Sequence, residues 1–268
     1  MSVLYRVFII VTLLLTGLSQ QSEAQEPSQT KHSEWSYPKS SKENIRILTY
    51  NVRNCRGMDG KTDYDRVAQV ILNIDPGFVA LQELDSVTTR SNNTDVLKVL
   101  AAKCGMNYVY GASIPFQGGK YGIGILSKEK PLRTSFFPLP GTEEKRGFLI
   151  AEFEKFILIC SHFSLTEADR ISSVQTINRQ VKGLKKTVFL AGDFNTSPES
   201  EAIHLISADW ENLSGIHPTF PSTLPKECID YIFTIRNDNP KLKVIRQEVV
   251  PEITASDHRP VFIDVNFK

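Results

Sequence analysis

The sequence has too few cysteines, too little excess charge and too short an apolar run to fit several large classes of protein. Its four cysteines are widely separated, so they form neither the paired spacing of a zinc knuckle nor a redox motif. The 31 basic residues are balanced by 30 acidic ones, whereas proteins that coat nucleic acid carry a clear basic excess. Walker A, serine-hydrolase and zinc-protease motifs are absent. The chemistry of this chain must therefore lie in shorter motifs.

Residues 1–24 have the composition of a secretory signal peptide. A short basic start ends at Arg6, an uncharged apolar run covers residues 7–18, and small residues follow. We expect cleavage before Gln25 and a secreted or periplasmic protein. The alternative is an uncleaved membrane anchor, but the apolar run is shorter than the roughly 20 residues that span a bilayer.

Residues 25–43 are rich in Ser, Gln, Lys and Glu and have almost no apolar content. Such a segment cannot bury enough surface to offset the entropy of ordering, so we predict a disordered tether. Residues 44–268 remain, and about 225 residues suit one large domain or two small ones. The motifs described below are spread over nearly this whole segment, which favours one domain.

Short apolar, β-branched runs recur along this domain and predict strands. They are residues 45–50, 78–81, 123–126, 148–153, 156–160, 187–191, 229–235 and 261–265. Helical periods lie at residues 64–74 and 96–101, and a third helix with Val174 on its apolar face opens at a capping-box pattern from Thr166 to Asp169. Many strands with few helices predict an α+β fold of layers.

Polar residues of metal-binding or acid–base type stand where six of these apolar runs begin or end. They are Asn51, Glu83, His162, Asp193 with Asn195, Asp230, and Asp257 with His258. Strand ends are rigid platforms, and several of them together can hold charges close that would otherwise repel. One such residue alone could be ordinary turn chemistry. Six in order predict one shared site.

The motifs that contain these residues resemble the ordered signature of the endonuclease/exonuclease/phosphatase superfamily. They read Tyr50-Asn51-Val52-Arg53, Leu81-Gln82-Glu83, Ser161-His162, Gly192-Asp193-Phe194-Asn195, Ile229-Asp230-Tyr231 and Ser256-Asp257-His258. The resemblance covers residues 45–267 and implies a four-layered α/β sandwich, in which two packed, mostly antiparallel β-sheets are flanked by helices. It also implies that residues 44–268 are a catalytic domain that hydrolyses a phosphodiester by metal-assisted attack of water.

The resemblance implies a Mg²⁺ site, with Mn²⁺ as a possible substitute. Glu83 would be the central metal ligand and Asn51 and Asp257 would complete or support the shell, because oxygen donors suit a hard divalent cation. Some relatives carry a carboxylate two residues after the Asn, where this chain has Arg53. A second metal position there is therefore not expected, and Arg53 is either a phosphate contact or a solvent-facing residue.

The resemblance also implies acid–base roles for the remaining motif residues. Asp193 would orient or deprotonate the attacking water, and Asn195 would place the phosphate and the nucleophile. His162 would donate to a phosphate oxygen as charge builds there. Asp230 would fix the ring of His258 and raise its pKa, so that a cation meets the phosphate.

Further side chains are candidates for the surroundings of this site. Tyr121 and Arg146, like Arg53, could contact the phosphate. Asp85 and Arg90 resemble a pattern found in small bacterial members of the family, and we expect them at the rim of the site or behind it.

The cysteines give one candidate disulfide. Cys55 and Cys228 each lie a few residues from a motif, so they could meet at the rim of the site, and export would permit the bond. Cys160 lies in an apolar run and is expected in the core, and Cys104 ends a predicted helix.

The sequence defines the substrate less closely than it defines the type of reaction. A nucleic-acid phosphodiester is our first prediction, with a phospholipid or sugar-phosphate substrate as the alternative. The Trp-Cys-Asp-Arg motif typical of inositol phosphatases is absent near Asp230. The two tryptophans, Trp35 and Trp210, cannot form the clustered aromatic hairpin expected of a sphingomyelinase. We expect a monomer.

Two other functions stay open. A dinuclear metallophosphatase would need several His ligands, and the five histidines are not paired at ligand spacing. A non-catalytic module that binds phosphorylated ligands would be marked by loss of the Glu, an Asp or the His, and all of them are present.

Overall fold

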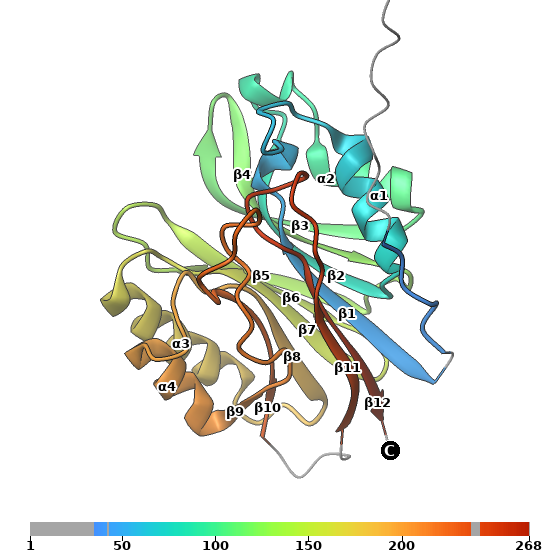
Figure 1. Ribbon diagram of the computed structural model, residues 1–268. Coiled ribbons are helices and arrows are strands. Elements are labelled where there is room, and N and C mark those ends of the chain that lie inside the picture. Colours follow the sequence, from blue (N-terminus) through green and yellow to red (C-terminus); the bar gives the residue numbers. More distant parts are fainter. Residues whose placement is uncertain (1–34, 42, 237–241, 268) are drawn as a thin grey trace, which may run out of the picture. The chain divides into compact units, whose positions relative to one another are not determined.

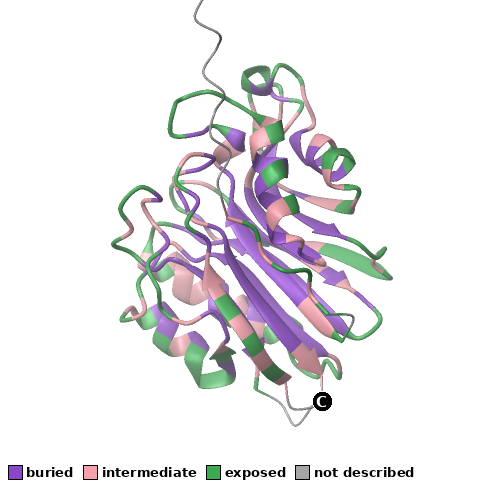
Figure 2. Ribbon diagram, turned by 45° about the vertical axis from the view of Figure 1, so that its right-hand side comes forward, coloured by how far each residue is buried: buried purple, intermediate pink, exposed green. Residues whose placement is uncertain are grey.

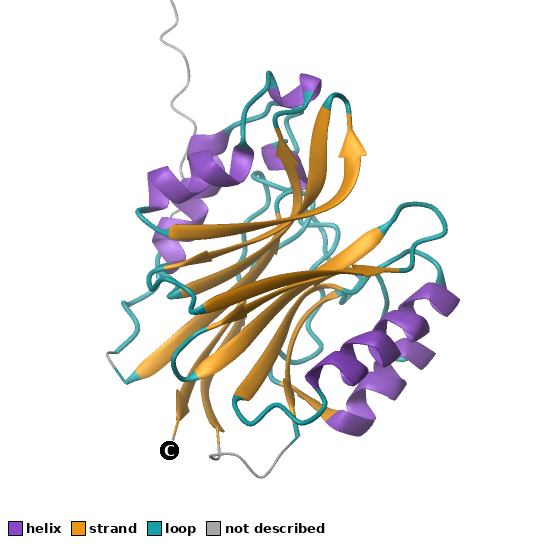
Figure 3. Cartoon of the chain, turned by 180° about the vertical axis from the view of Figure 1, so that it is seen from behind, coloured by secondary structure: helices purple, strands orange, loops and turns teal. Residues whose placement is uncertain are grey.

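The computed structural model describes residues 35–41, 43–236 and 242–267. Within these residues, two six-stranded β-sheets lie face to face and helices cover their outer faces (Figures 1 and 3). This arrangement confirms the predicted α+β sandwich. The signal peptide predicted at residues 1–24 lies outside the described residues. Among the helices of the described segments, none is both long enough and apolar enough to cross a membrane.

The two sheets have related strand orders. The first is β11-β12-β1-β2-β4-β3 and the second is β5-β6-β7-β8-β10-β9. The strand bounds are β1 Asn44–Asn51, β2 Phe78–Ser86, β3 Asn107–Phe116, β4 Gly119–Ser127, β5 Arg133–Leu139, β6 Arg146–Glu152, β7 Phe156–His162, β8 Thr187–Asp193, β9 Trp210–Asn212, β10 Asp230–Ile235, β11 Leu242–Val249 and β12 Val261–Phe267. One central pair in each sheet is parallel, β1 with β2 and β7 with β8, and the other pairs are antiparallel. The prediction of mostly antiparallel sheets is confirmed.

Each parallel pair is joined through a helix on the outer face of its sheet, as parallel strands require a long crossover. α1 (Tyr64–Ile74) connects β1 to β2, and α3 (Glu167–Val181) connects β7 to β8. α2 (Val96–Cys104) packs beside α1, and α4 (Glu201–Asp209) packs beside α3. Because the two strands of each pair are parallel, their carboxyl ends lie at the same end of the sheet.

The apolar core forms three layers, one between the sheets and one under each pair of helices. Successive residues of a strand point to opposite faces, so Ile47 enters the central layer while Leu48 packs under α1 and α2. In the second sheet Phe189 enters the central layer and Leu190 packs under α3 and α4. The central strands are therefore buried on both faces (Figure 2).

All eight predicted strands and all three predicted helices are present. The sequence analysis missed β3, β5, β9, β11 and α4. β11 is the clearest case, because every second residue in most of it is exposed and it carries Lys243, Arg246 and Glu248. An edge strand buries only part of one face, so its apolar signal is weak.

The capping box predicted at Thr166 and Asp169 is not formed. Thr166 is the N-cap residue of α3, but its side chain makes no cap hydrogen bond. Its hydroxyl donates instead to Glu143 at 3.3 Å, and Asp169 accepts the N–H of Thr142 at 2.6 Å. The spacing was right for a cap, but a neighbouring loop supplies competing partners.

The predicted tether ends earlier than residue 43. Residues 25–34 lie outside the described residues, but the ring of Tyr37 packs edge-on against Phe262 at 4.9 Å and its N–H donates to the carbonyl of Asn73. Trp35 also packs against the layer under α1 and α2. Two aromatic rings bury enough apolar area to order this short segment.

The Cys55–Cys228 disulfide is not formed, and all four cysteines, each within the described residues, are free. Cys55 is buried in the layer under α1 and α2, whereas Cys228 is buried in the layer under α3 and α4. The two thiols thus belong to opposite outer layers of the sandwich. Cys160 lies in the central layer, as predicted.

Candidate active site

The predicted site residues meet at one end of the sandwich, where β1, β7 and β8 end and β10 begins. His162 is the last residue of β7, Asp193 the last of β8 and Asp230 the first of β10. Asp193 pairs in the ladder with His162 on one side and with Asp230 on the other, so the three lie in one row across the second sheet. Asn51, the last residue of β1, faces this row from the first sheet.

Asp193 lies at the centre of the site and is 1% exposed. Its Oδ1 accepts the backbone N–H of Asn195 at 2.9 Å, and its Oδ2 accepts from Asn51 Nδ2 at 3.0 Å. The same Oδ2 is 3.5 Å from His162 Nε2 and 3.7 Å from His258 Nε2. Burial raises the pKa of Asp193, while the charge of His258 opposes that effect. The Asp193 carboxylate therefore lies among three donor groups, those of Asn51, His162 and His258, which all face its Oδ2.

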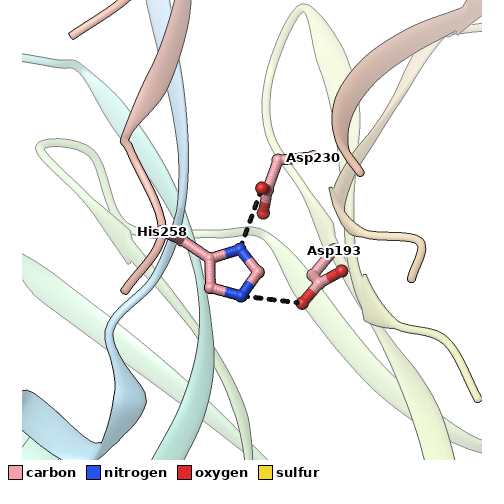
Figure 4. Close-up of side chains that lie close together, drawn as sticks. All are labelled: Asp193, Asp230 and His258. Carbon is pink, nitrogen blue, oxygen red and sulfur yellow. Dashed lines mark hydrogen bonds and ion pairs between the residues drawn. The ribbon is translucent and has the colours of Figure 1, made fainter. Parts of the chain in front are cut away.

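His258 is bound to a buried carboxylate. Its Nδ1 donates to Asp230 Oδ2 at 2.9 Å, and its Nε2 faces Asp193 (Figure 4). Burial alone would lower the pKa of His258, but the charges of Asp230 and Asp193 raise it to about 10. The Thr219 hydroxyl also donates to Asp230 Oδ2, at 2.6 Å, and the Phe220 ring lies 4.9 Å from the imidazole. The ring is thus fixed and cationic at neutral pH.

His162 is neutral, in contrast to the cationic His258. Its Nδ1 lies 3.3 Å from Arg146 Nη1, and a guanidinium group can only donate. Nδ1 must therefore accept, which places the proton of the neutral imidazole on Nε2, the atom that faces Asp193. Burial lowers the pKa of His162 well below its usual value, and the charges of Arg146 and His258 lower it further. His162 is a neutral donor.

Glu83 stands apart from this row, in an interruption of β2 rather than at its end. The pairing of β2 with β4 shifts between Leu81 and Leu84, and Glu83 has a φ of 60°. Asn195, after Asp193, has a φ of 50°. A residue other than glycine rarely adopts this region, and such conformations gather at functional sites. β2 is thus continuous, and the strand end predicted at Glu83 is a bulge.

One glycine of the site is required by a close backbone approach. A Cβ at Gly192 would lie 2.0 Å from the carbonyl oxygen of Ser161. The glycine therefore allows β7 and β8 to bring His162 and Asp193 side by side.

Glu83 and Asp257 are the two carboxylates predicted to bind a hard cation such as Mg²⁺. Glu83 is half-buried; its Oε1 accepts from Asn51 Nδ2 at 3.0 Å, and its Oε2 accepts no hydrogen bond from the described residues. Asp257 is 3.2 Å from the guanidinium of Arg53 and accepts from Ser256 at 3.3 Å. Asn51 is oriented with its N–H groups toward Glu83 and its oxygen toward the backbone of Arg53. It holds the carboxylates of Glu83 and Asp193 together.

A second group could also hold a metal by distance alone. Asp193, Asp230 and His258 offer ligand atoms within 4.8 Å of one another. A histidine binds metal through a neutral ring nitrogen, and in this group His258 Nδ1 already faces Asp230 and leaves Nε2 toward Asp193. Glu83 and Asp257 offer oxygen donors, the kind that suits Mg²⁺.

Tyr121 and Arg146, the two predicted phosphate contacts, are both buried, and the charges of Glu83 and Arg146 act on the Tyr121 hydroxyl. Tyr121 pairs across the ladder with Asp85, and burial followed by the charges of Glu83 and Glu144 raises its pKa. Arg146 is 7% exposed, donates to Glu144 at 2.8 Å, and has a buried Nε without a hydrogen-bond partner among the described residues. A buried, unpaired donor beside the catalytic row is a candidate substrate contact.

The sequence analysis missed Thr219, Phe220 and Glu144, and it gave no role to Ser256 within the Ser256-Asp257-His258 motif. Thr219 and Phe220 lie in the loop between β9 and β10 and act on the Asp230–His258 pair. The Ser256 hydroxyl donates to the carbonyl of Asn51 at 2.7 Å and so ties β1 to the segment before β12. Thr219, Phe220 and Glu144 stand neither at the end of a predicted strand nor within one of the six motifs, which were the main signals used.

A family model for the endonuclease/exonuclease/phosphatase family matches residues 48–258. The chain belongs to this family. Its members are hydrolases that act on phosphoester bonds, and the matched range contains every catalytic and metal-binding residue predicted from the motifs.

Solved structures of other family members share the fold. An endonuclease/exonuclease/phosphatase from Bacteroides vulgatus is 22% identical with a TM-score of 0.70, covering 84% of this chain and 99% of its own. A mannosyl-6-phosphatase from Bacteroides thetaiotaomicron is 18% identical with a TM-score of 0.66, covering 83% of this chain and 100% of its own. The human nocturnin catalytic domain, solved with bound sulfate, is 16% identical with a TM-score of 0.65, covering 85% and 96%. At these identities the similarity establishes the fold alone.

Proposed function

We propose that this protein is an exported, Mg²⁺-dependent phosphodiesterase in which Asp193 activates a water molecule for attack on phosphorus. The observation that carries the proposal is the arrangement around Asp193. A buried carboxylate faces a cationic His258, a neutral His162 and the Asn51 amide, with Glu83 on the far side of that amide. A base, two donors and an oxygen ligand for a cation are thus within one cluster of side chains.

Glu83, with Asp257 and Asn51, would hold the cation. When bound, Mg²⁺ or Mn²⁺ would polarise the phosphoryl group and neutralise part of its charge. The fit rests on the free Oε2 of Glu83 and on the oxygen chemistry of this donor set.

Asp193 takes the proton of the attacking water. Its Oδ1 is fixed by the N–H of Asn195, which leaves Oδ2 to face the reacting atoms. The water O–H bond breaks and its proton moves to Oδ2, while the oxygen forms the new bond to phosphorus. The ester P–O bond on the opposite side breaks, and the leaving oxygen carries the electron pair. Burial raises the pKa of Asp193 and so strengthens it as a base.

His258 and His162 stabilise the charge that builds on the phosphoryl oxygens. Asp230 and Thr219 keep His258 protonated and oriented, so its Nε2–H is a cationic donor. His162 donates through Nε2–H as a neutral group. Donors that are fixed before the reaction do not need to reorganise when charge develops, which is the main source of such stabilisation.

A nucleic-acid phosphodiester is the substrate that we propose first. Two guanidinium groups at the site, those of Arg53 and Arg90, are 37% and 36% exposed and could contact phosphates. A phospholipid is the second candidate, because Met58, Leu224 and Ile253 are exposed on loops near Asp257. The N–H of Met58 donates to Thr254, so two of these apolar side chains lie on adjoining loops.

Glu83→Ala and His258→Ala test the proposed chemistry. Each is expected to lower kcat for bis-p-nitrophenyl phosphate by about a thousandfold or more, because each removes a group that acts on the transition state. The exposed residues Glu211 and His204 provide matched controls, and Glu211→Ala and His204→Ala should keep wild-type turnover. Circular dichroism checks that the fold is intact. Near wild-type kcat in either site variant would refute the proposal.

Removal of the metal gives an independent test. EDTA followed by desalting should abolish hydrolysis, and Mg²⁺ or Mn²⁺ should restore it. Full activity in a metal-free preparation would contradict the cation requirement. The restored enzyme is then assayed on plasmid DNA, RNA, phospholipid vesicles and sugar phosphates, and the highest kcat/KM decides between the nucleic-acid and lipid candidates.

A further inference from the structure

Arg90 is held rigidly although 36% of its side chain is exposed. It is the central residue of the 3-10 helix η2 (Thr89–Ser91) and donates to Asp85 through Nε at 2.7 Å and Nη2 at 2.8 Å. Asp85 is 1% exposed and also accepts from the Thr88 hydroxyl at 3.0 Å. The guanidinium carbon lies 4.4 Å from the centroid of the Phe116 ring and 5.4 Å from that of Tyr121. Fixing an exposed arginine in this way costs side-chain entropy, and a surface ion pair contributes little stability in return.

This fixed cation lies within electrostatic reach of Glu83, one of the residues proposed to bind the metal. Asp85 stands two residues after Glu83 and opposite Tyr121 in the β2–β4 ladder. The hydrogen bonds that Arg90 donates to Asp85 raise the pKa of Arg90 most, and the charge of Glu83 raises it further. Arg90 in turn acts on Glu144, the partner of Arg146. Glu83, Arg90 and Arg146 all act on Glu144, so these four charged groups lie near one another.

The bidentate contact leaves one nitrogen of Arg90 available. Nε and Nη2 are bound to Asp85, whereas Nη1 makes no hydrogen bond to any described residue. The neighbouring Tyr121 is 8% exposed and its hydroxyl likewise donates to no described residue. The buried Nε of Arg146, whose charge also acts on Tyr121, has no hydrogen-bond partner among the described residues. Unsatisfied donors at the border of a site are typical of contacts that a ligand completes.

We propose that Arg90 and the Tyr121 hydroxyl form a subsite for a second anionic group of the substrate, such as a phosphate near the one that is hydrolysed. The proposal rests on the proposed function in that the first phosphate occupies the catalytic site. Asp85 then acts as the positioning residue that holds Nε and Nη2 and leaves Nη1 of Arg90 for the ligand. The substrate class is a phosphoester with a second phosphate, rather than a compound with a single phosphate.

The test compares ligands that differ by one phosphate. Alkane-α,ω-diol bisphosphates of two to six carbons and the alkyl monophosphates of the same lengths are titrated calorimetrically into the wild-type protein with Mg²⁺. We expect at least one bisphosphate to bind about tenfold more tightly than its monophosphate. In Arg90→Gln the two should bind within about twofold of each other, with the monophosphate affinity unchanged, and Arg90→Lys should keep part of the preference because it retains the charge without the fork.

Arg246 provides the matched control. It is also 36% exposed, stacks on Tyr37 and Phe262 and pairs with Glu248, but it lies within edge strand β11. Arg246→Gln should keep the full preference for the bisphosphate. A wild-type protein without any such preference, or a preference that survives in Arg90→Gln, overturns the subsite. Binding requires no turnover, so loss of hydrolysis with an intact preference would count against the proposed function and not against the subsite.

Discussion

The two histidines of the site differ in charge because their outer nitrogens meet opposite partners. His258 meets the carboxylate of Asp230, which stabilises the cation, whereas His162 meets the guanidinium of Arg146, which excludes it. Both rings nevertheless direct Nε2–H toward the same oxygen of Asp193. One site therefore contains a cationic and a neutral donor made from the same residue type.

Thr219→Val tests how Asp230 is oriented. Asp230 Oδ1 has no partner among the described residues, so the Thr219 hydroxyl and His258 alone fix this carboxylate through Oδ2. Valine keeps the shape but removes the donor, and we expect kcat to fall about tenfold with a small change in KM. Thr219→Ser should recover most of the loss, which a merely structural defect would not allow. Steady-state kinetics decide, and a wild-type kcat in Thr219→Val would exclude this role.

At the scale of elements, the loop before β6 is tied to the segment that follows β7. Glu143 accepts from the N–H of Leu165 and the hydroxyl of Ser164, both at 2.8 Å, and lies 3.5 Å from Arg146. Burial alone would raise the pKa of Glu143, but these hydrogen bonds and the charge of Arg146 lower it to about 2. The carboxylate thus joins the strands that carry Arg146 and His162.

Glu143→Gln should show this link as a pH-dependent loss of stability. A carboxylate whose pKa is lowered on folding stabilises the protein above its unfolded pKa of about 4.3, and the effect disappears as pH falls toward about 2. The difference in free energy of unfolding between wild type and variant should therefore be largest near pH 7 and shrink below about pH 4.3. Urea denaturation across this range measures it.

Glu129→Gln is the control with the opposite sign. Burial raises the pKa of Glu129, with a contribution from Glu154, so its charge opposes folding and the variant should gain relative stability as pH rises through the normal range of a carboxyl group. A Glu143→Gln difference that does not vary with pH would show that the ionised form contributes nothing to stability.

At the scale of the whole molecule, three apolar layers hold the described chain together. The four cysteines in it form no disulfide. Burial raises the pKa of every cysteine thiol, to about 11 for Cys104 and Cys228, about 12 for Cys160 and higher for Cys55. Such thiols are protonated and unreactive at neutral pH.

Thiol reactivity should follow these layers. In native buffer the thiol reagent 5,5′-dithiobis(2-nitrobenzoic acid) should react slowly with the half-buried Cys104 and more slowly with the others, and all four should react in guanidinium chloride. The midpoint of thermal unfolding should be the same with and without dithiothreitol. A protein that shows only two reactive thiols after unfolding without reductant would contain the disulfide that this structure lacks.

The sequence predicted the elements and residues whose signal is local. β1, β7 and β8 are continuous apolar runs because both of their faces are buried, and the polar residues at their ends were found for that reason. β11 was missed because an edge strand buries little, and Thr219 was missed because no apolar run adjoins it. The Cys55–Cys228 pair was misjudged because closeness to motifs in sequence does not give the layer into which a side chain points.

By itself, the sequence predicted the layered fold, which the structure confirms, and a set of candidate catalytic residues. Their order and strand-end positions follow from burial patterns that each segment carries alone. Only the tertiary structure decided how these residues act on one another. Contacts between segments far apart in the chain make His162 neutral and His258 cationic. Such contacts also set the bulge at Glu83 and the fixed position of Arg90. A pKa and a side-chain orientation are set by neighbours in space, which a linear pattern does not record.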